Sequence, residues 1–329
     1  MRIITSLFFF CLCTPIFAAC NGIDRLADLQ SEQRQELDQT IAQTPFPYGN
    51  HWKAEKPGST IHIVGTIHVY DPRLEVNLDR LKPAIKDAGM LLVEVTTDDE
   101  YALQQRLSRE PELLFITKGP TLPDLMSEDS WKKLADEARA RQIPAFMAAK
   151  FQPWYLSMML GIPPCAMSDI TSGKRGLDHL IMEYAKQADI PSQSLEDTLT
   201  LFKMFSNDPI EKQVEMLEAG IAVNQDANAM FATLVEAYFR EAHVEIWQYS
   251  RLHALQVSGQ DTDQTAEMFD EIEELLLNRR NQAWVPVILE AAAEHETIMV
   301  AAGAAHLGGD EGVLNLLNAE GYRLTRQDF

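Results

Sequence analysis

Basic residues are scarce in this sequence. The 329 residues include 28 Lys and Arg against 49 Asp and Glu, so the formal net charge at pH 7 is -21. A surface this acidic repels phosphate backbones and anionic lipid. We therefore expect no nucleic-acid partner, and we attribute the excess of acidic residues to solubility.

Long hydrophobic runs are absent beyond the start of the chain. Residues 1–19, MRIITSLFFFCLCTPIFAA, combine a basic start, a short apolar run and a small-residue end, which is typical of a secretory signal peptide. No later stretch reaches the roughly 20 apolar residues that a membrane helix needs. The sequence thus predicts an exported protein, periplasmic or secreted, whose mature chain has no transmembrane span.

Cysteine is rare as well. Of the four cysteines, Cys11 and Cys13 lie inside the predicted signal peptide, so Cys20 and Cys165 remain. An even pair in an oxidising compartment favours a disulfide bond. The alternative is a lipoprotein anchored through Cys20, because FAAC at residues 17–20 loosely resembles a lipoprotein cleavage site.

Serine and cysteine nucleophile motifs are also missing, since no GxSxG elbow occurs. Histidine is uncommon, with eight in the chain, yet two occupy equivalent positions. Each follows an apolar run, a glycine and two further residues, as GTIH at 65–68 and GAAH at 303–306. This repeated context singles out His68 and His306.

The order of apolar runs predicts the fold. The runs read as a hairpin at 51–69, a helix at 75–88, a strand at 89–95, a mostly helical region at about 98–296 with a short strand in PSQSLE at 191–196, a strand at 297–303, a helix at 312–319 and a strand at 322–327. We expect an α/β fold with a mixed sheet built from both chain ends and a large, mostly helical insertion. Residues 51–329 form this domain, after an N-terminal lead-in at 20–50.

Three predicted strands end in residues that can bind a metal or move a proton: His68, Glu94 and His306. In α/β sheets, ligands collect beyond the carboxyl ends of the strands. Two imidazoles and a carboxylate can hold a divalent metal with positions left open, and a water on that metal becomes a nucleophile near neutral pH. The metal-free alternative has one histidine as general base, with Glu94 setting its tautomer.

Five motifs in order carry a resemblance to a known family. GTIH at 65–68, LLVE at 91–94, GLD at 176–178, RRNQAW at 279–284 and GAAHLGGDEGVLNLLNAEGY at 303–322 together resemble the TraB/GumN/Tiki family, over about residues 52–326. The resemblance implies an α/β fold related to the haem-binding ChaN and erythromycin-esterase-like proteins. For the Tiki branch it implies a metal-dependent protease activity, with manganese or cobalt as the metal.

The family's two GxxH histidines match His68 and His306, and its acidic residue matches Glu94. These three are the expected ligands of a manganese, cobalt or zinc ion. The family's basic and amide pair matches Arg280 and Asn281, which the resemblance places beside the substrate.

Arg280 could hold a substrate carboxylate or stabilise an oxyanion, because its guanidinium keeps its charge. Without the family, Arg280 reads equally well as a surface cation beside Glu273 or Glu274 on a helix. Asp178 in the GLD motif matches the family too, with helix capping as its alternative role.

The resemblance also bears on the cysteines, because bacterial relatives have one cysteine just after the signal peptide and another in a Pro-Pro-Cys context, as at 163–165. That pattern favours the Cys20–Cys165 disulfide over lipid. We therefore expect an exported metal-dependent hydrolase, a peptidase by resemblance, acting on a peptide or small-molecule substrate. The alternative is a non-catalytic periplasmic protein that binds a metal, haem or small ligand.

Overall fold

A six-stranded mixed sheet forms the centre of the computed structural model, which describes residues 20, 22–206, 208–223, 226–257 and 261–329. The strand order is β4-β3-β5-β2-β1-β6. The strands are β1 (His51–Lys56), β2 (Ser59–Thr66), β3 (Met90–Val93), β4 (Ser192–Ser194), β5 (Thr297–Gly303) and β6 (Arg323–Arg326). Strands β4, β3, β5 and β2 run parallel, and β1 pairs antiparallel with both β2 and β6. The predicted α/β fold, with a sheet drawn from both chain ends, is confirmed.

The middle of the sheet is buried on both faces. On β5, Met299 and Ala301 join one apolar cluster, whereas Ile298, Val300 and Ala302 join the other. This alternation is what a parallel strand covered on both faces requires. The helices that cover the first face are α2 (Leu74–Asp87) and α9 (Leu177–Gln187), and those that cover the second are α15 (Arg279–Glu294) and α16 (Val313–Ala319).

The last third of the chain supplies the strand between β2 and β3. The sequence of β2, α2 and β3 predicts a parallel unit, and the two strands do run parallel. They are not neighbours, because β5 lies between them and pairs with both, from Thr60↔Thr297 on one side to Val93↔Ala301 on the other. Residues that are more than 200 positions apart in the sequence therefore meet at one edge of the sheet.

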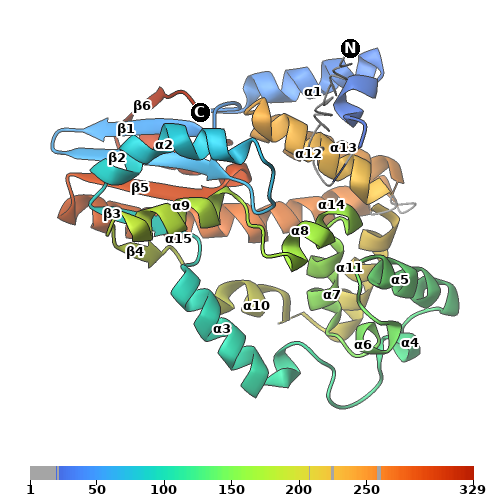
Figure 1. The fold of residues 1–329 in the computed structure, drawn as a ribbon. Coiled ribbons are helices and arrows are strands. Elements are labelled where there is room, and N and C mark those ends of the chain that lie inside the picture. The colour runs from blue at the N-terminus through green and yellow to red at the C-terminus, as the bar shows by residue number, and fades with distance from the viewer. Residues whose placement is uncertain (1–19, 21, 207, 224–225, 258–260) are drawn as a thin grey trace, which may run out of the picture.

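The predicted helical insertion is present between β3 and β5. Figure 1 shows the sheet with its covering helices on the left and most of the insertion on the right. Beyond α9, the described helices of the insertion up to α15 are α3 (Thr97–Arg109), α4 (Leu122–Leu125), α5 (Glu128–Ala140), α6 (Ala145–Ala148), α7 (Pro153–Leu160), α8 (Met167–Thr171), α10 (Leu199–Ser206), α11 (Ile210–Val223), α12 (Ala227–Phe239), α13 (His243–Val257) and α14 (Thr262–Glu273). The PSQSLE segment forms β4, as predicted.

A disulfide bond joins Cys20 to Cys165, 145 positions along the chain. The lead-in helix α1 (Ser31–Gln43) then packs through Leu37 and Ile41 against α12 and α13. Because its sulfur is bonded to Cys165, Cys20 has no thiol left to carry lipid in this structure. The predicted signal peptide at 1–19 lies outside the described residues.

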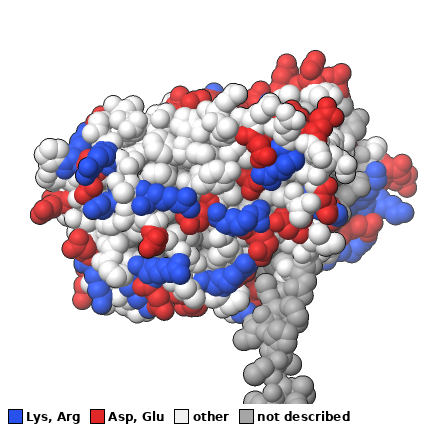
Figure 2. Space-filling model, turned by 90° about the horizontal axis from the view of Figure 1, so that it is seen from above, with Lys and Arg blue, Asp and Glu red and all other residues white. Residues whose placement is uncertain are grey.

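Charges of both signs are distributed over the surface. Figure 2 shows Lys and Arg side chains interspersed with Asp and Glu on the face seen from above, so the net charge of -21 does not make this face uniformly acidic. Among the described residues, no helix combines the length and the apolar character needed to cross a membrane.

Candidate functional site

The carboxyl ends of β2, β3 and β5 bring the three predicted site residues together. His68 follows β2, Glu94 follows β3 and His306 follows β5. Glu94 Oε1 accepts a hydrogen bond of 2.7 Å from the Gly303 N–H and lies 4.0 Å from His68 Nε2. A Cβ atom at Gly303 would lie 3.2 Å from Glu94 Oε1, so glycine at the end of β5 lets the carboxylate approach the backbone.

His68 is held by a carboxylate from α9. Its Nδ1 lies 3.0 Å from Asp178 Oδ2, while the imidazole is 65% exposed and Asp178 only 14%. Helix α9 starts against the end of β2, because the Leu177 N–H donates to the Ile67 carbonyl at 2.9 Å. Gly176 makes this approach possible, since a Cβ there would lie 2.0 Å from the Ile67 oxygen. Asp178, whose role the sequence left open, therefore orients His68.

His306 is buried and its tautomer is fixed by two neighbours. Its Nε2 lies 3.1 Å from Arg280 Nη1 and its Nδ1 lies 2.6 Å from Asn281 Oδ1. Because a guanidinium only donates, Nε2 accepts, and Nδ1 must carry the proton that it donates to Asn281. The imidazole also lies against Trp284, with 4.3 Å between the ring centroids. His306 is thus a neutral histidine enclosed by protein.

Arg280 joins two largely buried carboxylates. Its Nη2 donates to Glu94 Oε2 at 2.6 Å, and its Nε donates to Glu196 Oε1 at 3.0 Å. The Arg280 side chain is 6% exposed and that of Glu196 is 7% exposed. The interpretation of Arg280 as a surface cation beside Glu273 or Glu274 is therefore wrong.

All five N–H groups of Arg280 are occupied in this arrangement. Nε donates to Glu196, Nη2 donates to Glu94 and Glu196, and Nη1 donates to His306 and to the Leu276 carbonyl. Arg280 therefore positions Glu94 and His306, and its predicted contact with substrate stays a prediction. Asn281 is likewise buried, and its amide donates to the Glu311 carbonyl at 2.9 Å.

A π-helical turn immediately precedes the helix that carries Arg280 and Asn281. The residues before α15 form a π-helical turn, Glu274–Asn278, and the Leu276 carbonyl in that turn accepts from the Arg280 side chain. Such turns insert one extra residue into a helix and are frequent at functional sites. Arg280 and Asn281, consecutive residues in the first turn of α15, both reach His306.

The pKa values of the site residues separate widely. Burial favours neutral His68, but the hydrogen bond to Asp178 and the charge of Glu94 outweigh it and raise the pKa of His68 to about 9. This direction is consistent with the exposure of the ring, which limits the effect of burial. Burial lowers the pKa of His306 to about 3, and the charge of Arg280 acts in the same direction.

Glu94 remains ionised. Burial acts to raise its pKa, but the charge that His306 gains at low pH, the charges of His68 and Arg280, and the Gly303 N–H prevail and lower the pKa to about 2. At neutral pH the site therefore contains a protonated His68 and a charged Glu94 beside a neutral His306.

The comparison with known proteins agrees with the five motifs. The family model described as TraB/PrgY/gumN family matches residues 50–326. The chain belongs to this family. A curated relative from Treponema pallidum (strain Nichols), described as an uncharacterized protein, is 23% identical over 276 residues, which is 81% of this chain and 79% of the relative. No solved structure matches the chain. The predicted family is confirmed, whereas the activity that it implies stays a prediction.

This TraB/PrgY/gumN chain offers only part of the predicted metal site. His68 Nε2 and Glu94 Oε1 face each other, and Asp178 holds the other nitrogen of His68, as partners of metal-binding histidines do. His306 does not fit, because its Nε2 accepts from Arg280 and a metal there would meet a buried positive charge. Within the described residues, no three or more His, Cys, Asp or Glu side chains are arranged to hold a metal ion. Binding of manganese, cobalt or zinc stays a prediction.

Two residues of the site were missed from the sequence. Glu196 follows β4 as Glu94 follows β3, so the rule that singled out the other strand ends applies to it as well. His179 Nδ1 lies 3.2 Å from Asp178 Oδ2, and its Nε2 lies 3.1 Å from Glu100 Oε2 on α3. Hydrogen bonds to Asp178 and Glu100 raise the pKa of His179 to about 10. No motif around His179 in the sequence indicates that it pairs with Asp178 and Glu100.

Proposed function

We propose that this protein is an exported hydrolase in which His68 activates a water molecule against a peptide or another acyl substrate. The observation that carries the proposal is the pairing of an exposed imidazole with a largely buried carboxylate, His68 with Asp178. A histidine that acts as general base needs one ring nitrogen open to the reacting water. A hydrogen bond to the other nitrogen fixes the tautomer of the ring. Export is supported by the disulfide, which suits an oxidising compartment.

The reaction needs only groups that face the open side of the site. His68 Nε2 and Glu94 Oε1 are 4.0 Å apart, a gap that one water molecule can bridge with hydrogen bonds of about 2.8 Å to each. Neutral His68 takes a proton from this water as its oxygen attacks the carbonyl carbon. The protonated His68 then donates to the leaving group as the tetrahedral intermediate collapses.

Arg280 supports this reaction by holding Glu94. Its guanidinium keeps Glu94 charged and fixed, so that the carboxylate can accept a hydrogen bond from the second O–H of the water. Asp178 stabilises the imidazolium that forms on His68. Both contributions depend on preorganised charge in a partly buried site.

The raised pKa of His68 sets the pH dependence. At neutral pH most His68 is protonated, so kcat/KM is expected to rise about tenfold per pH unit and to level off near pH 9. Asp178→Asn removes the charge that favours the imidazolium, so the rising limb should move to lower pH while the plateau rate falls. If the rising limb of the kcat/KM profile stays at the same pH in Asp178→Asn, Asp178 does not set the pKa of His68.

The proposal is tested by hydrolysis of a quenched-fluorescent peptide library and a panel of p-nitrophenyl esters. His68→Ala should abolish turnover. His295→Ala is the matched control, because His295 lies just before β5, at the opposite edge of the sheet. The metal content of each sample, measured with and without chelator, separates the two mechanisms. Activity that survives chelation supports the proposal, whereas activity restored only by manganese, cobalt or zinc supports the predicted metal-dependent hydrolase. Saturable binding of metal or haem without turnover would favour the predicted binding protein.

A further inference from the structure

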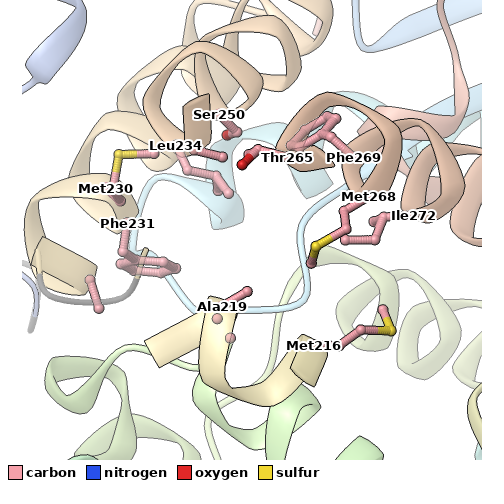
Figure 3. Close-up of a pocket in the computed structure, with 14 residues that line it drawn as sticks. Met216, Ala219, Met230, Phe231, Leu234, Ser250, Thr265, Met268, Phe269 and Ile272 are labelled. Atoms are coloured by element: carbon pink, nitrogen blue, oxygen red, sulfur yellow. The ribbon is translucent and has the colours of Figure 1, made fainter. Parts of the chain in front are cut away.

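A cavity of ≈ 340 Å³ lies within the helical insertion, between α11, α12, α13 and α14. Figure 3 shows its lining side chains, which come from several helices and surround a common space. None of the residues that form the His68 site lines this cavity. Its size falls in the range of small-molecule sites, roughly 300–1,000 Å³.

The walls of the cavity are helix faces that would ordinarily pack together. On α14 the lining positions are 265, 268, 269 and 272, and on α12 they are 227, 230, 231 and 234. Both sets have the i, i+3, i+4, i+7 spacing of a core-facing stripe. Figure 3 shows Met230 and Phe231 on one side of the space and Met268 and Phe269 on another. The stripes face a shared space between them.

Small residues create the room. Gly220 lies inside α11, and a Cβ atom added there would have no heavy atom within 4 Å. Glycine inside a helix is less favourable than alanine by roughly 0.5–1 kcal/mol. Ala219 and Ala254 also line the space. The helix thus carries an unfavourable residue at a point where a larger one would project into the cavity.

The chemistry of the walls selects an apolar and flexible ligand. Among the residues that the structure describes, no charged side chain lines the cavity, and the lining hydroxyls are bonded within their own helices. Ser250 Oγ donates to the Ile246 carbonyl at 2.8 Å, and Thr265 Oγ1 donates to the Asp261 carbonyl at 3.1 Å. Three methionines, Met216, Met230 and Met268, supply side chains that adapt to a ligand of variable shape.

Two basic side chains lie close to lining positions. Lys212 is one helical turn before Met216 and pairs with Glu271 of α14 at 2.7 Å and with Asp208 at 3.7 Å. Arg251 follows Ser250 and pairs with Asp270 of α14. An anionic head group could replace either acidic partner, while an apolar chain enters between the helices.

We propose that this cavity binds the alkyl chain of a single-chain amphiphile whose anionic or zwitterionic head remains beside Lys212 and Arg251. A free fatty acid and a monoacyl phospholipid share this chemistry. The site is separate from the His68 centre, and its occupation does not depend on the proposed hydrolysis.

The test uses the chain from Cys20 to Phe329 with its disulfide intact, titrated with dodecanoate and with dodecanoyl lysophosphatidylcholine below their micelle concentrations. Calorimetry should show saturable binding of about one molecule per chain. Gly220→Leu fills the cavity and should weaken binding at least about tenfold. Gly220→Ala, which adds a single methyl group, is the matched control and should bind nearly as the parent does. Binding of dodecanoate alone identifies a fatty-acid site, and binding of the lysolipid alone identifies a phospholipid site.

A second measurement covers the case in which Gly220→Leu does not fold. In the parent protein labelled with 13C-methyl methionine, the ligand should shift the signals of Met216, Met230 and Met268. The signals of Met90 and Met299, which belong to the sheet, should stay in place. The proposal is overturned by the absence of binding of both ligands, by unchanged affinity in folded Gly220→Leu, or by equal shifts of all methionine signals.

Discussion

Removing the Cys20–Cys165 disulfide should lower the stability of the protein by several kcal/mol. The bond closes a loop between residues 145 positions apart. Chain entropy for a closed loop of this length corresponds to about 5 kcal/mol at 25 °C. With an unfolding entropy of about 2.1 cal/mol/K per residue over roughly 310 residues, this free energy corresponds to a fall in Tm of about 8 °C.

The loss should leave most of the fold in place. Leu26 packs in the cluster of α1, α12 and α13, and Arg25 pairs with Asp226, so non-covalent contacts still hold the N-terminal segment. The expected effect therefore arises in the unfolded chain, which gains freedom when the loop opens. A large loss of native helical signal at 20 °C is not expected.

The assay is thermal unfolding followed by circular dichroism, comparing the parent with the double variant Cys20→Ser, Cys165→Ser. Dithiothreitol should lower the Tm of the parent to that of the double variant and leave the double variant unchanged. A fall of less than about 2 °C would refute the loop-entropy reasoning, because it would correspond to well under half of the free energy expected for a loop of this length.

Three further predictions concern the site. Glu196→Gln leaves the buried Arg280 with one carboxylate, Glu94, and should lower the free energy of unfolding by about 3 kcal/mol, measured by urea titration. A loss below about 1 kcal/mol would contradict the buried pairing of Arg280 with Glu196. Arg280→Met frees Nε2 of His306 and removes a positive charge, so this variant should bind Co²⁺ more tightly than the parent in a spectroscopic titration; equal or weaker binding would show that Arg280 does not oppose a metal at His306. Gly176→Ala places a Cβ 2.0 Å from the Ile67 oxygen, so it should separate α9 from the end of β2 and reduce turnover more than tenfold. Unchanged turnover would show that Asp178 reaches His68 without this close approach.

The positions of His68, Glu94 and His306 could be predicted because parallel strands place their carboxyl ends at one edge. That inference needs only strand boundaries and direction, which the apolar runs supply. The order of the strands could not be read in the same way. Placement of β5 between β2 and β3 depends on pairing across more than 200 residues, and no local pattern encodes it.

The contacts between the site residues were less predictable than their positions. The sequence around Arg280 is compatible with an exposed helix cation and with a buried one. The packing of α15 against β5 determines that the side chain is buried. The pairing of Asp178 with His68 depends on how closely α9 approaches β2. Glu196 could be predicted from the sequence, because it is the last residue of PSQSLE, the segment that predicts a strand.

The position of β5 also decides when the protein can first assemble its site during synthesis. Thr297–Gly303 lies within the last 33 residues of the chain, yet it pairs with both β2 and β3. Until those residues leave the ribosome, the strands that end in His68 and Glu94 have no common neighbour to hold them together. A product truncated before residue 297 would therefore contain most of the 329 residues but would lack β5 and His306, so the candidate site could not form.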